Sequence, residues 1–334
     1  MKRAITVLLP AILFVTSAQA GSAGFRELSV SDGTDRPLQV GLWYPTDAAP
    51  SKQRLGTGEQ LVAPGAAVAG RALPLVVLSH GTGGWYGSHV DTALALAEAG
   101  FVVAALSHTG DTYDDHSRAA RTWDRPRQLH RLIDFMLSEW PEHAQLDAAK
   151  VGAFGFSAGG FTVLVAAGGT PDFSKIAAHC AAHPDFYDCR LLEASTQDTD
   201  AGPAGPPIAF VHDPRITAAV VAAPALGYTF APGGLKGVTA EVQLWQAEND
   251  RILPGDEYAP AARDALPKAP EFHLVANADH YDFLSTCSAQ LAHIAPEICL
   301  SREGFDRAAF HGRFNANVVR FFERALKAKP TSAP

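Results

Sequence analysis

The sequence is poor in charge, in cysteine and in repetition. Only 19% of its 334 residues are charged, and the formal net charge is −8 with a pI near 5.9. An acidic chain of this kind gives no electrostatic reason to expect a nucleic acid or an anionic membrane surface as a partner. We find no internal repeat, and the share of hydrophobic residues, 47%, is ordinary for a globular protein. The composition therefore indicates a globular chain and leaves its oligomeric state open.

Long hydrophobic runs are also scarce. The run "AITVLLPAILFV" is too short to cross a bilayer, which takes about 20 apolar residues. It follows Lys2 and Arg3 and precedes the small-x-small sequence "AQA", so the three parts of a secretory signal peptide are present. We expect residues 1–20 to be a signal peptide, and residues 21–334 to be one exported domain, periplasmic or secreted, without a transmembrane segment.

The four cysteines form two pairs that are close in sequence. Cys180 and Cys189 are one pair, and Cys287 and Cys299 are the other. An oxidising compartment permits disulfides with three possible connectivities. Proximity favours Cys180–Cys189 and Cys287–Cys299.

A zinc site is the alternative for Cys180. The segment "HCAAHPDFYDC" also offers His179 and His183 as ligands. Structural zinc sites usually hold Cys and His in tighter pairs, so we expect no metal here.

The N-terminal part of the chain has the pattern of an antiparallel sheet. Residues 25–30 and 38–44 alternate between apolar and polar side chains, and the polar turn "DGTDRP" separates them. This pattern predicts a β-hairpin. Residues 46–72 are rich in Ala, Gly and Pro, so we expect a surface loop there.

Strands and helices alternate from residue 73 onward. "LPLVVLSHG" (73–81) is a continuous apolar run, typical of a strand that is buried on both faces of a parallel sheet. Further strands are expected at 101–108, 150–157, 216–225, 240–248 and 271–278. The alternation predicts right-handed crossovers and hence an α/β fold with a mostly parallel, twisted sheet and helices on both faces.

The segment at about 170–215 interrupts this alternation. It contains two cysteines and the Pro/Gly-rich "DAGPAGPPIAF", and it has little helical periodicity. It follows the serine motif described next, so we expect an insertion over the carboxyl edge of the sheet, where open α/β sheets bind ligands. The insertion is either a small lid or an inert surface excursion.

A serine stands between glycines at the end of one predicted strand. Gly155-Phe156-Ser157-Ala158-Gly159 fits the pattern G-x-S-x-G between a strand and a helix. The glycines leave room for a sharp turn that exposes the hydroxyl, and the N-terminus of the following helix favours negative charge there. Glycine-serine turns without activity are common, so a nucleophile also requires a base and an acid elsewhere in the chain.

Candidates for the base and the acid follow in the order that the mechanism requires. Asp250 and His280 each follow a predicted strand, on the same sheet edge as Ser157. An imidazole oriented by a carboxylate is the usual activator of a serine hydroxyl. Glu248 is the competing acid. Asp250 lies beyond its strand, where a loop can direct it toward His280, and is therefore preferred.

The loop "SHGTGG" (79–84) closes the first long parallel strand. It is the position at which a second amide donor for an oxyanion is expected, so the backbone N–H groups of Thr82 and Ala158 are the candidates. The alternative is a loop whose glycines only form a turn.

Several aromatic and polar residues flank these elements. Trp85, Tyr86 and Tyr281 are candidate substrate-binding walls, although ordinary packing is the alternative. His108 follows a predicted strand on the same edge and is a candidate for the pocket wall, whereas His80 is expected to brace its loop. We expect no metal role for any histidine and no cofactor.

With these residues assigned, the chain resembles exported α/β-hydrolases, more narrowly the bacterial predicted dienelactone hydrolases that are similar to platelet-activating factor acetylhydrolase. The motifs that carry the resemblance are "VGLWYPT", "LPLVVLSHGTGG", "GFSAGG", "RITAAVVAAPALGYTF", "ADHYDFL" and "ICLSREGFDRAAFH". The resemblance implies a Ser–Asp–His triad at Ser157, Asp250 and His280, no cofactor, and hydrolysis of small-molecule or lipid esters, often with short or oxidised acyl groups.

This sequence departs from the family pattern in two ways. Dienelactone hydrolases proper use a cysteine nucleophile where this chain has Ser157, which argues against lactone substrates. The animal acetylhydrolases place the acid after the strand that follows the nucleophile helix, where this chain reads "AAPALG". Acyl transfer to an alcohol and a non-catalytic binding role on the same scaffold are the alternative functions.

Overall fold

The computed structural model describes residues 21–197, 210–230 and 232–327. The expected signal peptide at residues 1–20 lies outside this part of the chain, as do residues 198–209 of the expected insertion. Within the described part, no helix combines the length and the hydrophobicity that crossing a membrane requires.

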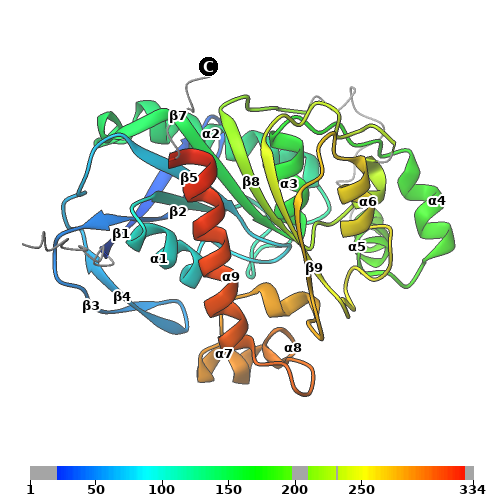
Figure 1. Cartoon of the computed structure of the whole chain (residues 1–334). Coiled ribbons are helices and arrows are strands. Elements are labelled where there is room, and N and C mark those ends of the chain that lie inside the picture. The colour runs from blue at the N-terminus through cyan, green and yellow to red at the C-terminus, as the bar shows by residue number, and fades with distance from the viewer. Residues whose placement is uncertain (1–20, 198–209, 231, 328–334) are drawn as a thin grey trace, which may run out of the picture.

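The described residues form ten strands around which the helices pack (Figure 1). The strands are β1 (Ser22–Asp32), β2 (Asp35–Thr46), β3 (Ser51–Leu55), β4 (Gly58–Pro64), β5 (Leu73–Ser79), β6 (Val102–Ser107), β7 (Leu146–Phe156), β8 (Ile216–Ala222), β9 (Glu241–Ala247) and β10 (Glu271–Val275). The α-helices are α1 (Val90–Glu98), α2 (Arg125–Ser138), α3 (Ala158–Ala166), α4 (Lys175–Ala182), α5 (Tyr187–Gln197), α6 (Ala259–Ala265), α7 (Ala289–Ile294), α8 (Pro296–Cys299) and α9 (Arg307–Phe322).

The strand order is β10-β9-β8-β7-β5-β6-β2-β1-β4-β3. The strands from β10 to β6 are all parallel, whereas β2 runs antiparallel to both β6 and β1. The predicted mostly parallel α/β sheet with an N-terminal antiparallel hairpin is therefore confirmed. Because β5, β7, β8, β9 and β10 are parallel, their carboxyl ends lie along one edge, and the loops that follow them converge there.

Helices cover both faces of the sheet. On one face, α2 and α3 bury apolar side chains against residues such as Leu75 and Val77 of β5. On the other face, α1 and α9 pack against the alternate residues Val76 and Leu78 (Figure 1). This explains why β5 is a continuous apolar run: all seven of its residues are buried, because successive side chains enter two different cores.

The expectation of a surface loop over residues 46–72 is wrong in part. Residues 51–64 form the β3–β4 hairpin, and β4 pairs in parallel with β1. Within β4, Gln60 and Val62 are buried, and Leu61 is exposed. Gln60 accepts a hydrogen bond from the indole N–H of Trp43 at 2.8 Å. These strands are short, and Ala- and Gly-rich segments flank them. The alternation of buried and exposed residues along them was therefore not recognised in the sequence.

The segment at 170–215 contains helices, although its sequence shows little helical periodicity. The described part of this insertion contains α4 and α5, which the Cys180–Cys189 disulfide joins. Each helix is short, with eight residues in α4 and 11 in α5. Helical periodicity is hard to detect in segments of this length.

Two disulfides are present, Cys180–Cys189 and Cys287–Cys299, and no described cysteine is free. The second bridge closes a loop with a sequence separation of 12 that contains α7 and α8. Both pairings are the ones that proximity favoured.

Reduction of these bridges is expected to lower the free energy of unfolding by about 2–4 kcal/mol per bridge, because the reduced unfolded chain gains conformational freedom. Thermal unfolding with and without a phosphine reductant, with free thiols counted in each sample, measures the effect. An unchanged melting temperature in a sample with four free thiols would contradict it.

Candidate active site

Ser157 lies at a sharp turn between β7 and α3. Its backbone has a positive φ of 56°, an uncommon conformation for a residue with a side chain. A Cβ atom at Gly155 would come within 2.1 Å of the Gly159 carbonyl oxygen, and one at Gly159 within 1.9 Å of the Ser79 carbonyl oxygen. Both glycines are therefore needed for the close approach of β7, α3 and β5 that forms the turn.

The turn places the Ser157 hydroxyl next to an imidazole. His280 Nε2 is 3.0 Å from Ser157 Oγ, and His280 Nδ1 is 2.7 Å from Asp250 Oδ2. A carboxylate only accepts hydrogen bonds, so Nδ1–H donates to Asp250, and Nε2 of the neutral ring is left to accept the serine proton. The structure thus brings together the three residues that the sequence singled out.

Backbone amides fix the Asp250 carboxylate. Its Oδ1 accepts hydrogen bonds from the amides of Ile252 at 3.0 Å and Leu253 at 2.7 Å, which leaves Oδ2 for His280. Glu248, the competing acid, accepts a hydrogen bond from the amide of Asn277 instead, at 2.8 Å. The geometry therefore supports the preference for Asp250.

His280 opens a short 3₁₀ turn, η4 (His280–Phe283), that is capped at its start. Asp279 accepts hydrogen bonds from the His280 amide at 2.8 Å and the Arg251 amide at 3.0 Å. Asp282 in turn accepts from the Asp279 amide at 2.8 Å. This reciprocal capping fixes the backbone from which the imidazole projects.

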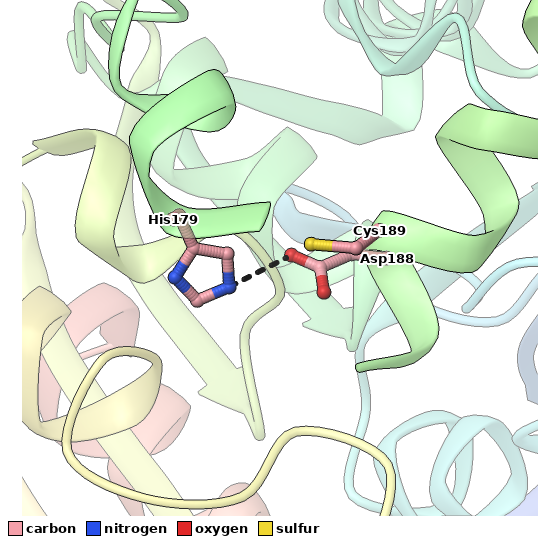
Figure 2. Close-up of side chains that lie close together, drawn as sticks. All are labelled: His179, Asp188 and Cys189. Carbon is pink, nitrogen blue, oxygen red and sulfur yellow. Dashed lines mark ion pairs between the residues drawn. The ribbon is translucent and has the colours of Figure 1, made fainter. Parts of the chain in front are cut away.

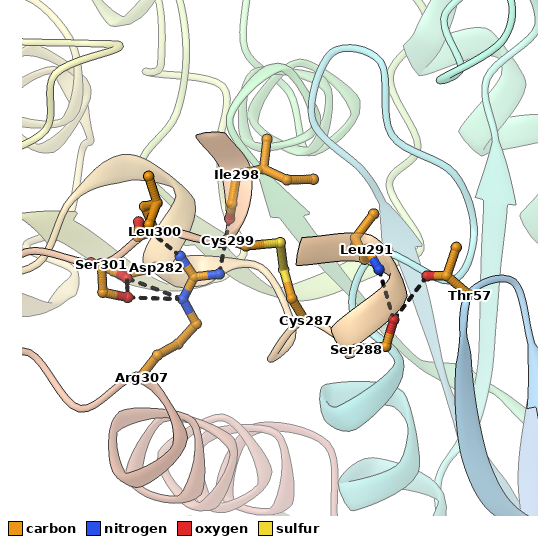
Figure 3. Close-up of a disulfide and its surroundings, with 10 residues drawn as sticks. All are labelled: Thr57, Asp282, Cys287, Ser288, Leu291, Ile298, Cys299, Leu300, Ser301 and Arg307. Atoms are coloured by element: carbon orange, nitrogen blue, oxygen red, sulfur yellow. Dashed lines mark hydrogen bonds and ion pairs between the residues drawn. A yellow bond between two sulfur atoms is a disulfide. The ribbon is translucent and has the colours of Figure 1, made fainter. Parts of the chain in front are cut away.

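Arg307 ties this turn to the disulfide-bridged segment (Figure 3). Its guanidinium donates to Asp282 at 3.1 Å and to the carbonyl oxygen of Ile298 at 2.9 Å, beside Cys299. The Cys287–Cys299 bridge, α9 and the His280 turn therefore form one connected unit.

A buried ion pair holds the loop that contains Thr82. Arg125 donates to the Asp111 carboxylate at 2.7 Å and to the His80 carbonyl oxygen at 2.7 Å, and Asp111 also accepts from the Gly83 amide at 2.7 Å. Thr82 and Ala158 line the same pocket as Ser157. The two residues whose amides are the expected oxyanion donors thus lie at the same pocket as the hydroxyl.

His108 does not line the pocket, contrary to the expectation. It is fully buried, with Nε2 at 2.8 Å from Ser79 Oγ and Nδ1 at 2.7 Å from Gln128 Oε1. His80 is not among the residues that line the pocket either. Its Nε2 accepts from the His108 amide at 3.0 Å, so it braces the loop as expected.

The pocket at Ser157 is apolar and encloses about 550 Å³, its solvent-open mouth included. Its walls come from the Thr82 loop, α3, α4, α5 and the segments after β8 and β9. The lining residues are Thr82, Ala120, Thr122, Trp123, Ser157, Ala158, Phe173, Ile176, Tyr187, Asp188, Leu191, Leu192, Ala225, Leu226 and Leu253. The insertion therefore forms part of the pocket wall.

Trp85, Tyr86 and Tyr281, proposed from the sequence as pocket walls, are not among the lining residues. Trp85 packs over Gly56 and Gly87, where a Cβ would come within 2.8 and 2.5 Å of its ring. The Tyr86 hydroxyl donates to a glutamate of β1 at 2.7 Å. The sequence identified aromatic residues close to the motifs but could not orient them, and it missed Trp123, Phe173 and Tyr187.

His179, Asp188 and Cys189 have ligand atoms within 4.8 Å of one another (Figure 2). Cys189 is bonded to Cys180, so its sulfur is not a thiolate. Asp188 accepts hydrogen bonds from the hydroxyls of Tyr258 at 2.8 Å and Tyr228 at 3.1 Å. With the disulfide formed, the donor set of this cluster does not suit zinc.

Three buried histidines titrate far from their usual range. Burial lowers the pKa of His80 to about 3 and that of His89 to about 4, and it places the pKa of His108 well below its ordinary value. His311 is the opposite case, because its hydrogen bond to the Asp91 carboxylate raises its pKa in spite of burial.

The free energy of unfolding is therefore expected to fall as the pH is lowered from about 6.5 toward 4. Below pH 6.5 the three histidines bind protons in the unfolded chain but not in the folded one, and each contributes a slope of about 1.4 kcal/mol per pH unit. His311, whose pKa is raised, contributes in the opposite direction only above about pH 6.5 and adds no slope below it. Urea unfolding at pH 7.5, 6 and 5 measures the slope, and a free energy that is constant or rises on acidification would contradict it.

Comparisons with known proteins agree with the architecture. No protein-family model matches the chain, and a search of curated proteins finds no match. Among solved structures, a ferulic acid esterase from Streptomyces cinnamoneus superposes with a TM-score of 0.62 over 96% of this chain and 95% of that chain, at 19% sequence identity. The chain therefore has an α/β-hydrolase fold.

Proposed function

We propose that the protein is a serine hydrolase of carboxylic esters. The single observation that carries this proposal is the chain of hydrogen bonds from Asp250 through His280 to the Ser157 hydroxyl, which lies at an apolar pocket. An ester hydrolase requires a nucleophile, a base, an orienting acid and a place for an apolar group. All four are present within one site.

In the proposed acylation step, His280 Nε2 takes the Ser157 proton as the hydroxyl oxygen attacks the ester carbonyl carbon. Asp250 stabilises the imidazolium that forms and keeps Nδ1 protonated throughout. The amides of Thr82 and Ala158 donate to the developing oxyanion, and removing one such donor typically costs about 10²–10³-fold in rate. His280 then protonates the leaving alcohol, and the acyl group remains on Ser157.

In the deacylation step, water takes the place of the alcohol. His280 accepts a proton from the water, the resulting hydroxide oxygen attacks the acyl carbon, and Ser157 regains its proton from His280 as the acid leaves. No step requires a cofactor. The same three residues carry both the acylation and the deacylation step.

The proposed biological setting is the periplasm or the extracellular space. A signal peptide at residues 1–20 is part of this proposal, and the two disulfides support an oxidising compartment. The finer assignment, to the bacterial predicted dienelactone hydrolase and acetylhydrolase-like family, rests on the sequence motifs. The proposal of small or short-acyl esters as substrates rests on the same motifs, and the ferulic acid esterase among the similar structures supports ester hydrolysis in general.

A chain-length series of 4-nitrophenyl esters, from acetate to octanoate, tests the proposal with purified protein. We expect turnover of at least one ester, because the pocket at Ser157 accepts an apolar group. Absence of turnover for every ester, lactone and amide tried, with a folded protein, contradicts it. Repeating the assay with added primary alcohols separates hydrolysis from acyl transfer, since transfer yields a new ester in place of the acid.

A further inference from the structure

The pocket at Ser157 contains one charged residue in an otherwise apolar wall. Among the described residues that line it, Asp188 alone carries a charge at neutral pH. Asp188 shares the inner face of α5 with Tyr187, Leu191 and Leu192, which follow helical spacing. A carboxylate among these side chains is costly to bury, so its presence there calls for an explanation.

The contacts of Asp188 are those of an ionised carboxylate. Its Oδ1 accepts from the Tyr258 hydroxyl at 2.8 Å, and its Oδ2 accepts from the Tyr228 hydroxyl at 3.1 Å. Both carboxylate oxygens thus accept hydrogen bonds from hydroxyl groups, which carry no charge to pair with a carboxylate. The residue is 6% exposed, so little solvent screens that charge.

No strong cation neutralises Asp188 within the part of the chain that the structure describes. Its one ion-pair contact there is His179, whose Nε2 is 3.6 Å from Oδ2 (Figure 2). Burial lowers the pKa of His179, so this ring is mainly neutral near pH 7. Among the described residues, the pocket wall therefore contains one carboxylate that no lysine or arginine pairs with.

We propose that Asp188 is a specificity-determining residue that excludes substrates bearing a negative charge on the group that enters the pocket and favours neutral or cationic groups. This inference rests on the proposed esterase function and deepens it. Carboxylate-terminated acyl chains, the products of lipid oxidation, are then poor substrates, whereas uncharged chains of the same length are accepted.

The size of the effect follows from simple electrostatics. Two like charges about 6 Å apart at an effective dielectric constant of about 20 repel enough to change an affinity or a rate about 100-fold. Greater distance or more solvent reduces this to about 10-fold. A difference of 10-fold or 100-fold between two substrates is easily measured as a ratio of their kcat/KM values.

Asp188 also has a structural role that the test must separate. Its hydrogen bonds fasten α5 to Tyr228 and Tyr258 of the core, next to the Cys180–Cys189 bridge. A purely structural role would lower the turnover of all substrates together. A specificity role changes the ratio between charged and uncharged substrates.

The test uses two sets of matched esters. For the acyl side these are 4-nitrophenyl hexanoate, mono(4-nitrophenyl) adipate and 4-nitrophenyl 6-aminohexanoate, which differ in the charge at the chain end. For the alcohol side they are 4-methylbenzyl acetate and 4-carboxybenzyl acetate. Each kcat/KM is measured for the wild type, for Asp188→Asn and for Tyr228→Phe.

In at least one set, the wild type is expected to prefer the neutral ester over the anionic one by about 10- to 100-fold. Asp188→Asn is expected to narrow that gap by about 10-fold and to remove any preference for the cationic ester. Tyr228→Phe removes a hydrogen bond but leaves the charge, so it should keep the wild-type ratio.

Ratios in Asp188→Asn that equal those of the wild type in both sets overturn the inference, as does a wild type that accepts anionic and neutral esters equally. A wild type that hydrolyses none of the esters instead overturns the proposed esterase function. The two failures are therefore distinguishable. Thermal unfolding of each variant shows whether a common loss of turnover comes from a displaced α5.

Discussion

Replacement of Ser157 by alanine is expected to lower kcat/KM for a 4-nitrophenyl ester by about 10⁴-fold or more. The variant keeps the oxyanion donors and the pocket, so binding persists, but no hydroxyl remains at 3.0 Å from His280 Nε2 to form the acyl-enzyme. The exposed fraction of Ser157 is 8%, so the loss of its hydroxyl hardly perturbs the surface. Steady-state kinetics of the purified variant measure the change.

Ser285→Ala is the matched control. Ser285 also lies close to an aspartate and a histidine, but its hydroxyl donates to Asp91, and His311 uses Nδ1 for Asp91 and Nε2 for the Asp282 carbonyl oxygen. No ring nitrogen is left to accept a proton from Ser285. This variant is expected to retain kcat/KM within a few-fold, and equal losses in both variants would contradict the assignment of Ser157 as the nucleophile.

Asp250→Asn is expected to lower kcat by about 10⁴-fold. Oδ1 accepts from the amides of Ile252 and Leu253, so an asparagine keeps its carbonyl oxygen there and turns its NH₂ group toward His280 Nδ1. A donor at this position forces the imidazole proton onto Nε2, and a protonated Nε2 cannot accept the proton of Ser157. The fold of the loop should be preserved, so melting temperature is expected to change little.

Glu248→Gln is the control for this prediction. Glu248 takes part in neither of the two hydrogen bonds of His280, and its contact with the Asn277 amide survives in glutamine. Its kcat is expected to stay within about threefold of the wild type. A large loss in Glu248→Gln together with a small loss in Asp250→Asn would mean that the acid has been assigned to the wrong residue.

The sequence was sufficient to predict the residues whose role depends on their place along the chain. Ser157, Asp250 and His280 each follow a strand of the parallel part of the sheet, and parallel strands end at a common edge, so their convergence follows from the topology. The motif G-x-S-x-G also predicted the two glycines of the turn. In the structure, the close contacts of Gly155 and Gly159 leave no space for a side chain.

The pocket walls could not be predicted in the same way. The pocket wall includes Trp123, Phe173 and Tyr187, which come from short or irregular segments. The directions of such segments depend on long-range contacts. The Cys180–Cys189 bridge sets the position of α5 relative to α4, and no local pattern encodes that position. Trp85 and Tyr86 were chosen because they are near the motif in sequence, which does not determine the direction of a side chain.

The same limit applies to the buried polar contacts. Arg125 and Asp111 are separated along the chain, and the two residues meet only because α2 and the loop after β6 pack around the Thr82 loop. The hydrogen bonds of Asp188 with Tyr228 and Tyr258 join three separate elements. Such networks depend on tertiary packing, which a single sequence does not reveal.

The central claim is that His280 activates the Ser157 hydroxyl. Mass spectrometry of the protein after treatment with a fluorophosphonate tests it most directly, because this reagent reacts with activated serines and leaves a stable adduct. We predict one adduct per chain, on the peptide that contains Ser157, and loss of labelling in His280→Ala. A folded wild type that takes up no reagent, or an adduct on another serine, would contradict the account.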